Sequence, residues 1–405
     1  MSDDWLPRRA LVLGLAVTGR AAAQALAERG AEVVATDRSP DADAARLAEL
    51  GVEVRLGTEE EALLEGVELV VKNPGVPAES PLAAATVARG IPLWSEIELG
   101  YRLLPGNPVL GVTGTKGKTT TVRLLGAMFA AAGVKHELAG NEHRPLSEVA
   151  GEVDAGTWIV CELSSFQLEH VVTFACEIAV LLNLEPDHLD RHHTFEAYRD
   201  AKLRIFERAK TKIGPGDFSV DDPLPAEPLI PGAHNRENAA AATAAARAAG
   251  IDDDAIAEAL RTFRGVPHRL ELVRELRGVR YVNDSKATNT AAARRGVRAY
   301  DVPLRVILGG SLKGEDFGPF ARDLPENVRS IYLIGQATDE LAAALDAAGR
   351  AYSRDDDLAH AVAHASADAE AGDIVLLSPA CASYDQFENF EQRGDVFRHL
   401  VEELA

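Results

Sequence analysis

The stretch VLGVTGTKGKTTTVRLL, residues 109–125, constrains the fold of this chain more than any other. A run of apolar residues gives way to glycines, then to a lysine, three threonines and a helix-like pattern. This order predicts a strand, a loop and a helix that together cradle phosphate groups. Gly114 and Gly117 let backbone N–H groups approach phosphate oxygens, and the helix starting near Lys118 adds the positive end of its dipole.

The end of this loop carries side chains suited to a nucleotide. Lys118 can reach the outer phosphates, and Thr119 can hold Mg²⁺. The strict G-x-x-x-x-G-K-T pattern is not met, because Val112 stands where its first glycine would be. A plain glycine turn before a helix is the structural alternative, and the G-K-T-T-T ending disfavours it.

Composition limits the possible classes of protein. With 405 residues and 46% hydrophobic content, we expect two or three domains, each with its own core. The net charge of −21 argues against a nucleic-acid-binding surface. No segment approaches the roughly 20 apolar residues of a membrane span, so we expect a cytoplasmic protein without membrane insertion. The three scattered cysteines indicate neither a disulfide framework nor a zinc site.

Lysine is rare in this chain, which has 33 arginines and only nine lysines. An ammonium is compact, can shift its pKa and can be chemically modified, and a guanidinium cannot replace it in these tasks. Chance clustering is the alternative to a functional interpretation. Five of the nine lysines lie in polar motifs: Lys116, Lys118, Lys202, Lys286 and Lys313.

Residues 10–38 predict a Rossmann-type unit, with a strand at ALVLGLAV, a turn at TGR, a helix at AAAQALAERG and a strand at AEVVATD. Gly14 and Gly19 flank the turn, and Asp37 ends the second strand, where a Rossmann carboxylate meets a ribose. Ala16 replaces the middle glycine of G-x-G-x-x-G, which disfavours a nicotinamide oxidoreductase. The strand VELVVK then runs into the turn at 73–77, NPGVP, which is either a plain turn or part of a ligand site.

Three strands of the central region are expected to end at one edge of a parallel sheet. The first precedes the phosphate loop, the second is 157–161 and ends at Glu162, and the third is 178–184 and precedes His188. Thr119, Glu162 and His188 would then share one cleft, with the carboxylate near a nucleotide-bound Mg²⁺. A satisfied strand-end glutamate is the alternative for Glu162. The three histidines between 188 and 193 could form a zinc site, but no H-E-x-x-H motif or cysteine partner accompanies them.

The rest of the central region predicts two helices and an irregular segment. Residues 195–206 read as a helix that carries Lys202, whereas the segment 207–230 is rich in Pro, Gly and Asp, with little room for strands. An Ala-rich helix opens at 234–238, where Asn235 and Asn238 can share one face toward a purine or its phosphates. Capping of that helix is the alternative role for Asn235.

The last third repeats the alternation of strands and helices. Strands at 279–282, 305–310 and 374–377 each end in small and charged residues, so a second pocket is expected at their carboxyl ends.

Eight motifs together resemble the Mur ligases, and the resemblance covers nearly the whole chain. They are G-T-K-G-K-T at 114–119, E-L-S-S-F-Q at 162–167, D-H-L-D-R at 187–191, A-K-L-R-I at 201–205, H-N-x-x-N at 234–238, P-H-R at 267–269, N-D-S-K-A-T-N at 283–289 and S-P-A-C-A-S at 378–383. Within the family, residues 378–394 are similar to the members that add D-glutamate to UDP-N-acetylmuramoyl-L-alanine.

The resemblance implies an α/β fold of three domains. These are an N-terminal Rossmann-like domain for the UDP group at 1–104, a central P-loop ATPase with a shortened parallel sheet at 105–264, and a C-terminal Rossmann-like domain for the amino acid at 265–405. It also implies a monomeric enzyme whose partners are small molecules: ATP, D-glutamate and UDP-N-acetylmuramoyl-L-alanine. ATP phosphorylates a carboxylate to an acyl phosphate, the amine attacks it, and a tetrahedral intermediate collapses to an amide.

The resemblance further implies roles for individual residues. The ATP contacts would be Gly114, Thr115, Lys116, Gly117, Lys118, Thr119, Thr120, Asn235, Asn238, Arg269 and Asp284. The UDP-substrate contacts would be Gly14, Leu15, Thr18, Gly19, Asp37, Arg38, Asn73, Pro74, Gly75, Asn141 and Ser164. D-glutamate would meet Lys286, Thr288, Lys313, Ser383 and Phe390. Two Mg²⁺ sites would involve Thr119, Glu162, His188 and a carbamylated Lys202, and the catalytic residues would be Lys118, Glu162, His188 and Lys202.

Two departures from the family pattern stand out. The family's G-N-I-G turn is Gly140-Asn141-Glu142-His143 here, which questions the substrate contact of Asn141, and the stretch between Lys202 and His234 is short. Two other functions remain open at this point. One is a related ligase that adds L-glutamate or another amino acid. The other is a P-loop switch or binding protein without ligase activity, which would not need Lys286, Thr288 and Lys313.

Overall fold

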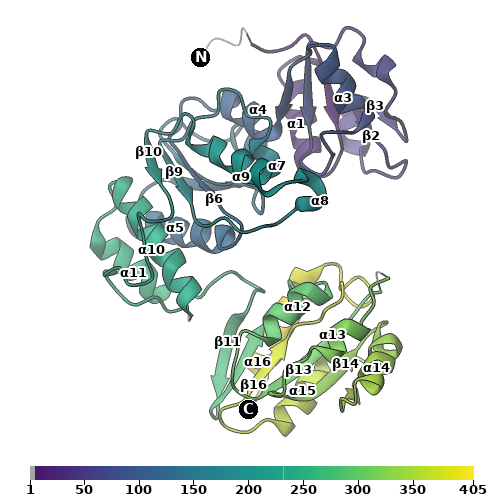
Figure 1. Ribbon diagram of the computed structural model, residues 1–405, viewed down its shortest axis with the longest axis vertical. Helices are drawn as coiled ribbons and strands as arrows, with labels where there is room; N and C mark the ends of the chain where they lie inside the picture. Colours follow the sequence, from purple (N-terminus) through teal and green to yellow (C-terminus); the bar gives the residue numbers. More distant parts are fainter. Residues whose placement is uncertain (1–4, 231, 313) are drawn as a thin grey trace. The chain divides into compact units, whose positions relative to one another are not determined.

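The computed structural model describes residues 5–230, 232–312 and 314–405, which form two compact units with the chain boundary between Phe263 and Arg264. The first unit contains two five-stranded sheets and the second contains one six-stranded sheet (Figure 1). All but one of the strand pairings are parallel, the exception being an antiparallel pair at the edge of the third sheet. The predicted α/β class with parallel sheets is therefore confirmed.

The first sheet has the strand order β3-β2-β1-β4-β5. Its strands are β1 (Arg9–Leu13), β2 (Glu32–Asp37), β3 (Glu53–Leu56), β4 (Leu69–Lys72) and β5 (Leu93–Ser95). Helices α1 (Val17–Ala27), α2 (Ala45–Glu49) and α3 (Pro81–Ala88) and the short η1 (Glu61–Leu64) connect them. Side chains alternate along β1, so Val12 packs toward α1 and Leu11 toward α3.

The predicted turn at 18–20 is wrong, because β1 ends at Leu13 and α1 already begins at Val17. The chain turns earlier, at Gly14, whose φ is +89°. The backbone N–H of Leu15 then donates to the carboxylate of Asp37 at 2.7 Å. This bond fixes the turn on the end of β2, so Thr18 lies in the first turn of the helix.

The second sheet has the order β10-β9-β6-β8-β7. Its strands are β6 (Val109–Thr113), β7 (His136–Gly140), β8 (Trp158–Glu162), β9 (Ile178–Leu181) and β10 (Thr211–Ile213). Its helices are α5 (Lys118–Ala131), α6 (Leu146–Val149), α7 (Ser165–Leu168), α8 (Leu189–His192), α9 (Phe195–Leu203), η2 (Arg204–Phe206), α10 (Ala233–Ala248) and α11 (Asp253–Thr262). One face packs on α5, α10 and α11, and the other on α6 and on α4 (Glu96–Leu103). Strands β8 and β9 both pair in parallel with β6, so the three strands end at one edge of the sheet, as predicted.

The segment 207–230 is largely irregular, as predicted, with one exception. The prediction left little room for a strand, whereas β10 adds three residues to the edge of the sheet by pairing with β9. Capping by Asn235 is also wrong, because α10 begins at Ala233 and Asn235 lies inside it. Its cap is Gly232, with φ +99°, a value that glycine tolerates and most other residues do not.

Helix α4 ties the first sheet to the second. Glu98, whose side chain is fully buried, accepts hydrogen bonds from the backbone N–H groups of Val172, Thr173 and Phe174 at 2.8–2.9 Å. Glu96, on the same helix, accepts hydrogen bonds from the backbone N–H and the hydroxyl of Ser147 at 2.6 and 2.7 Å. Two carboxylates on one helix thus bind the backbone of the central region.

Glu96 should make the stability of this unit depend on pH. Burial raises the pKa of Glu96 to about 7, and its Oε2 accepts no hydrogen bond from the described residues. Between pH 4.5 and 7 the folded chain keeps a proton that the unfolded chain releases, so the free energy of unfolding falls as pH rises through this window. The shift corresponds to about 3 kcal/mol.

Glu96→Gln removes this titration but keeps an acceptor for Ser147. We therefore expect urea unfolding of the variant to lose about 2–3 kcal/mol less between pH 5 and pH 8 than the wild type does. Glu98→Gln is the matched control. Burial acts to raise the pKa of Glu98, but hydrogen bonds outweigh it and lower the pKa. The contribution of the Glu98 carboxylate to the free energy of unfolding should therefore be lost as pH falls, opposite to that of Glu96. Parallel pH profiles for wild type and Glu96→Gln would rule the explanation out.

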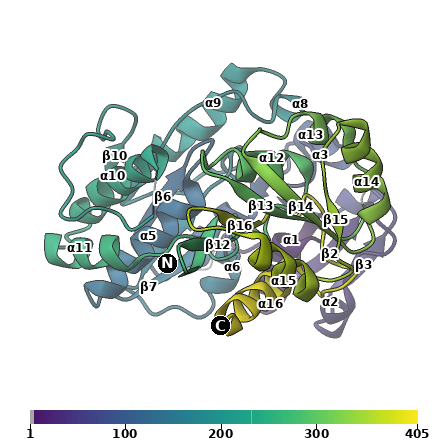
Figure 2. The same cartoon turned by 90° about the horizontal axis from the view of Figure 1, so that it is seen from below.

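The third sheet has the order β11-β12-β16-β13-β14-β15. Its strands are β11 (Glu271–Leu276), β12 (Val279–Asn283), β13 (Leu304–Gly309), β14 (Val328–Ile334), β15 (Ser353–Arg354) and β16 (Ile374–Leu377). Helices α12 (Thr290–Val297), α13 (Gly318–Arg322) and α14 (Thr338–Ala347) cover one face, and α15 (Leu358–Asp368) and α16 (Phe390–Glu403) cover the other (Figures 1 and 2).

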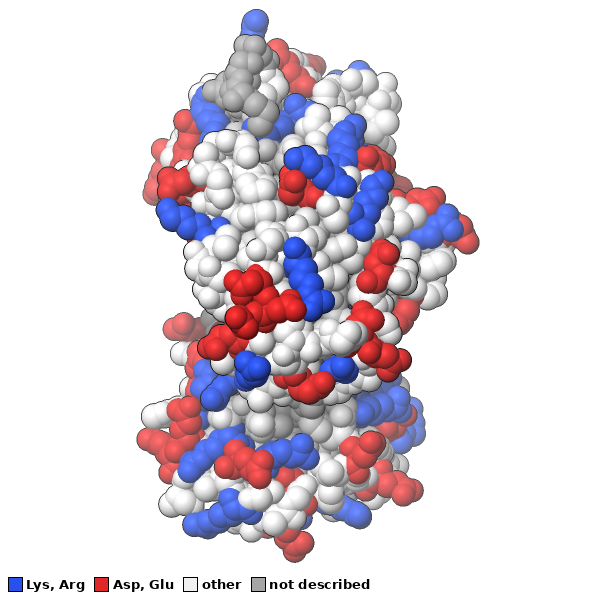
Figure 3. All heavy atoms as spheres, turned by 90° about the vertical axis from the view of Figure 1, so that its left-hand side faces the viewer, with Lys and Arg blue, Asp and Glu red and all other residues white. Residues whose placement is uncertain are grey.

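Charges of both signs are interspersed on the face drawn in Figure 3. Figure 3 shows lysine and arginine side chains among aspartates and glutamates over the face turned toward the viewer. No described helix has the length and apolar character that a membrane crossing requires.

Candidate functional site

The predicted phosphate loop joins β6 to α5. Gly117 precedes α5 with φ +85°, a left-handed value that favours glycine. A Cβ at Gly117 would lie only 2.2 Å from Oδ1 of Asn238, so the loop and α10 touch here. The predicted nucleotide residue Asn238 is therefore packed directly against the phosphate loop, one turn beyond Asn235 on the same helix.

Residues of the loop after β9 and of α9 contact Thr115 and Lys116 of the phosphate loop. The hydroxyl of Thr115 contacts the Tyr198 hydroxyl at 2.9 Å, and Lys116 pairs with Glu185 at 2.6 Å. The Lys116 backbone N–H donates to the side chain of Asn183 at 2.9 Å. Sequence reasoning missed these partners, because the only signal for Asn183 and Glu185 was a position after a buried strand, and Tyr198 lies within a helix.

Lys118 is folded back over the loop. Its ammonium donates to the carbonyl oxygens of Gly114 and Thr115 at 2.9 and 3.1 Å. The buried hydroxyl of Thr119 follows at the first turn of α5, and Thr120 is the next residue of the same turn.

Glu162 ends β8 beside this loop and is almost fully buried. Burial raises the pKa of its carboxyl group, while Asn141, Lys118 and Thr119 act in the opposite direction. Oε1 accepts a hydrogen bond from Asn141 at 3.2 Å, whereas Oε2 accepts none from the described residues. A buried carboxylate oxygen without a hydrogen bond is costly unless a cation compensates for it.

Lys202 is buried on α9 and reaches the same loop. Its Nζ donates to the carbonyl oxygen of Gly114 at 2.8 Å and lies 4.9 Å from the centre of the Tyr198 ring. Burial, and then the charge of Lys118, lower the pKa of Lys202 to about 7. The structure thus brings Lys118, Glu162 and Lys202 close enough for the charge of Lys118 to lower the pKa of both Glu162 and Lys202.

His188 lies at the start of α8 with φ +52°, and its side chain is half exposed. Its ring lies 5.1 Å from that of Phe166 and 6.4 Å from that of Tyr198, measured between centroids. Tyr198 therefore lies close to both His188 and the buried Lys202.

Nine of the eleven predicted UDP-substrate residues lie at or just beyond the carboxyl ends of β1, β2 and β4, whereas Asn141 and Ser164 follow β7 and β8 of the second sheet. Asn73 donates to the hydroxyl of Thr18 at 2.7 Å and accepts from the backbone N–H of Gly75 at 2.8 Å. A Cβ at Gly19 would lie 1.8 Å from the carbonyl oxygen of Gly14, so helix and turn are in close contact. Arg38 follows Asp37 and is exposed, whereas Pro74 lies in the loop after β4.

Arg191 connects this cluster to the central sheet and was missed by sequence reasoning. Its guanidinium donates to the carbonyl oxygens of Pro74, Gly75 and Val76 at 3.1–3.4 Å. It also lies 4.7 Å from the ring centre of Phe166. Ser164, predicted to contact substrate, caps α7 through a reciprocal pair of bonds with Gln167.

In the second unit, Asp284 is buried at the end of β12. It accepts hydrogen bonds from the Ser378 hydroxyl at 2.8 Å and the Leu270 backbone at 3.3 Å, and burial raises its pKa to about 7. The charge of Arg269 acts against this shift, so the two predicted ATP residues of this unit are near one another.

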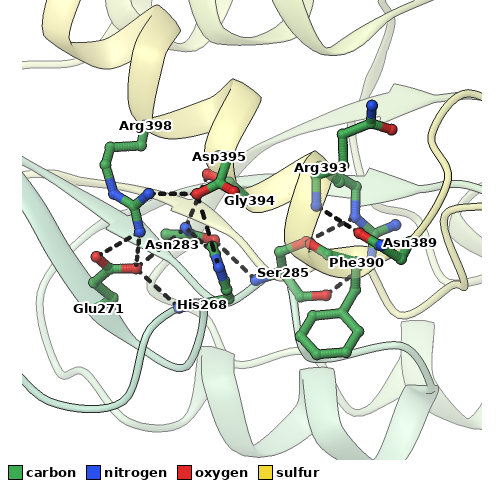
Figure 4. A network of polar contacts seen from close by, with 11 residues as sticks. His268, Glu271, Asn283, Ser285, Asn389, Phe390, Arg393, Gly394, Asp395 and Arg398 are labelled. Carbon is green, nitrogen blue, oxygen red and sulfur yellow. Dashed lines mark hydrogen bonds and ion pairs between the residues drawn. The ribbon is translucent and has the colours of Figure 1, made fainter.

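Arg393 brings the predicted amino-acid residues together. This fully buried guanidinium donates to the hydroxyl and carbonyl of Ser285 and to the carbonyls of Cys381 and Ala382 at 2.8–3.1 Å. The Ser285 hydroxyl in turn donates to the carbonyl of Phe390 at 2.8 Å (Figure 4). Lys286, Ser383 and Phe390 are thus carried by loops that meet at one arginine, and Lys286 lies 5.9 Å from the Phe390 ring. Thr288 is partly buried in the loop after β12, and Lys313 lies outside the described residues.

A cavity of about 440 Å³ opens at the carboxyl ends of β14 and β15. It is lined by Gly335, Gln336, Thr338, Asp339, Arg354, Asp356, Asp385 and Gln386. The predicted amino-acid residues within the described part of the chain are not among these. Lys286 and Thr288 lie in the loop after β12, Ser383 lies in the loop after β16, and Phe390 begins α16.

The residues around Glu162 fit a hydrated divalent cation. Glu162 presents a buried oxygen without a hydrogen bond beside the hydroxyl of Thr119. Within 5–230, 232–312 and 314–405, no three His, Cys, Asp or Glu side chains come together as a complete metal site. An ion here would therefore need phosphate oxygens and water as further ligands, as Mg²⁺ ordinarily does.

Three stretches of the chain match known domains. Residues 8–95 match the N-terminal domain of MurD-like Mur ligases, residues 112–223 the Mur ligase middle domain, and residues 268–381 the glutamate ligase domain of Mur ligases. Together these stretches span most of the chain.

Curated relatives match from end to end. The UDP-N-acetylmuramoylalanine–D-glutamate ligases of Pelotomaculum thermopropionicum and Geobacillus kaustophilus are each 40% identical, over 99% and 98% of both chains. The first alignment runs over 454 positions, whereas this chain has 405 residues, so at least 49 positions lack a residue here. The chain is thus a compact variant.

Solved structures share the fold at low identity. The UDP-N-acetylmuramate–alanine ligase of Thermotoga maritima has a TM-score of 0.55 at 16% identity, over 97% of this chain and 99% of that one. A UDP-N-acetylmuramoyl-L-alanyl-D-glutamate–2,6-diaminopimelate ligase has a TM-score of 0.56 at 20% identity, over 92% of each chain. From the matched domains and the full-length relatives, this chain belongs to the Mur ligase family, whose members are ATP-dependent ligases.

Proposed function

We propose that this chain joins D-glutamate to UDP-N-acetylmuramoyl-L-alanine at the expense of ATP, as a step in the synthesis of peptidoglycan precursors. The observation that carries the proposal is the 40% identity, over essentially the whole length of both chains, to relatives named for this reaction. The arrangement of Lys118, Glu162 and Lys202 around one phosphate loop supports it.

ATP would bind with its phosphates over the loop at 114–120. Backbone N–H groups and Lys118 would hold the phosphate oxygens, and Asn235 and Asn238 would contact the nucleotide from α10. In the second unit, Arg269 and Asp284 are the proposed ATP contacts. The boundaries 1–104, 105–264 and 265–405 are proposed for the three domains, in a cytoplasmic monomer.

Two magnesium sites are proposed, one at Thr119 and one at Glu162 and His188 with the carbamate of Lys202. Bound Mg²⁺ would neutralise phosphate charge as the phosphoryl group moves. The buried position of Lys202 supports the carbamate, because a neutral amine can attack CO₂ and release one proton to form it. The carbamate would turn a cation into an anion beside the metal, which arginine cannot do.

The protein side chains would mainly position reactants and stabilise charge. ATP transfers its γ-phosphoryl group to the substrate carboxylate, the amine of D-glutamate attacks the acyl carbon, and the tetrahedral intermediate expels phosphate. Lys118 would stabilise negative charge on the transferred group. The UDP substrate would bind the loops after β1, β2 and β4, with further contacts from Asn141 and Ser164. D-glutamate would meet Lys286, Thr288, Lys313, Ser383 and Phe390, whose ammonium groups suit its carboxylates.

Phosphate release in the presence of ATP, Mg²⁺ and UDP-N-acetylmuramoyl-L-alanine tests the proposal. D-glutamate is expected to support turnover, and L-glutamate at the same concentration is expected to give little. Turnover with L-glutamate alone would favour the related ligase instead. ATP hydrolysis that is indifferent to every amino acid would favour a P-loop switch protein.

A further inference from the structure

A histidine lies beside the strand-end carboxylate Glu162, and the chemistry proposed above gives it no role. Nε2 of His143 is 3.7 Å from Oε2 of Glu162, and the His143 side chain is only 6% exposed. The other carboxylate oxygen, Oε1, accepts a hydrogen bond from Asn141. Each oxygen of the carboxylate therefore faces one side chain of the same turn, 140–143.

The backbone fixes this turn on the end of β8. The N–H of Asn141 donates to the carbonyl oxygen of Glu162 at 2.9 Å, and the N–H of His143 donates to that of Gly140 at 3.0 Å. Gly140 has φ +98°, and a Cβ there would lie 2.1 Å from the carbonyl oxygen of Glu162. The imidazole is thus placed by a short, tightly packed turn and not by a flexible segment.

We propose that His143 is a further ligand of the metal ion at Glu162 and shifts the preference of this site toward ions that bind imidazole, such as Co²⁺. The proposal rests on the proposed function, because it takes Glu162 as a metal-binding carboxylate. Metal bonds to nitrogen and to carboxylate oxygen are about 2.1 Å long, so two ligands of one ion can be up to roughly 4.2 Å apart. The separation of 3.7 Å leaves room for an ion between them.

The chemistry of the donor explains the selectivity. Mg²⁺ prefers oxygen ligands, whereas imidazole nitrogen favours the later first-row ions, whose affinity also rises in the order Mn²⁺, Fe²⁺, Co²⁺, Ni²⁺. In the G-N-I-G turn that the resemblance implies, a glycine occupies the place of His143. The imidazole is therefore a feature of this chain and not of the family pattern.

Titration of the full-length protein with CoCl₂ and with MgCl₂, in the presence of ADP, tests the proposal. His143→Gly is expected to weaken Co²⁺ binding about 10- to 100-fold and to change Mg²⁺ binding less than about threefold. The visible absorption of bound Co²⁺ should change as one nitrogen ligand is lost. His143→Gln, which keeps a polar side chain without an imidazole, should behave in the same way, and circular dichroism verifies that both variants fold.

His193→Gly is the matched control, because His193 is an exposed histidine with φ +63°, a conformation that glycine adopts freely. This variant should bind Co²⁺ and Mg²⁺ with the affinities of the wild type. Unchanged or tighter Co²⁺ binding by folded His143→Gly and His143→Gln overturns the role of His143. If the wild type binds neither ion, the proposed metal site at Glu162 is wrong. Glutamate-dependent phosphate release tests the proposed ligase activity independently of that result.

Discussion

Lys202→Ala is expected to lower kcat on the order of 100-fold or more, and short carboxylates such as formate or acetate are expected to restore part of the loss. The variant removes a buried side chain that reaches the phosphate loop at the carbonyl of Gly114. If Lys202 acts through its carbamate, the missing group is an anion beside the metal, and a small carboxylate can diffuse into the vacated space. Steady-state phosphate release with and without added formate measures both effects.

Two controls separate the carbamate from a structural role. Lys210→Ala removes an exposed lysine that pairs with Glu177 on the surface of the same region, so it should retain nearly full activity. Lys202→Arg keeps a cation but cannot be carbamylated, so it should be as inactive as Lys202→Ala. Wild-type protein in ¹³C-labelled bicarbonate should show a carbamate resonance that both Lys202 variants lack. Full activity of Lys202→Ala, or loss without any rescue, contradicts the carbamate.

Local sequence signals predicted the parts of the fold that depend on neighbouring residues. The apolar run before Gly114 and the G-K-T ending predicted a strand, a loop and a helix, and the structure has them at β6 and α5. The same logic placed Glu162 at a strand end, since the carboxyl ends of parallel strands meet at one edge. The turn at 18–20 failed because a distant carboxylate, Asp37, fixes the chain earlier.

The remaining features could not be predicted because their partners are far apart in the sequence. Arg191 reaches the carbonyls after β4 across 115–117 positions, and Arg393 reaches Ser285 across 108. Neither arginine stands out in a chain whose usual cation is arginine. The lysine-poor composition gave a better signal, and it singled out Lys118 and Lys202, which the structure brings to one loop.

Arg393→Met is expected to destabilise the second unit by about 3–5 kcal/mol and to raise the KM for D-glutamate. The fully buried guanidinium donates to the hydroxyl and carbonyl of Ser285 (Figure 4). It also donates to the carbonyls of Cys381 and Ala382. The variant leaves the carbonyls of Ser285 and Cys381 buried without this donor, whereas the carbonyl of Ala382 still accepts from the backbone N–H of Ser311 at 2.9 Å. At roughly 3 °C per kcal/mol for a unit of this size, the unfolding temperature of the second unit should fall by about 10 °C or more in calorimetry.

Arg398→Met is the matched control, because Arg398 lies on the same helix. Its guanidinium pairs with Glu271 and Asp395 and its side chain is 30% exposed, so its removal should cost less than about 1 kcal/mol. The effect on KM follows from the position of Arg393 between the loops that carry Lys286 and Ser383. Equal, small shifts in unfolding temperature for the two variants would mean that the carbonyls find other donors. An unchanged KM for D-glutamate in a folded Arg393→Met variant would separate this buried arginine from the amino-acid site.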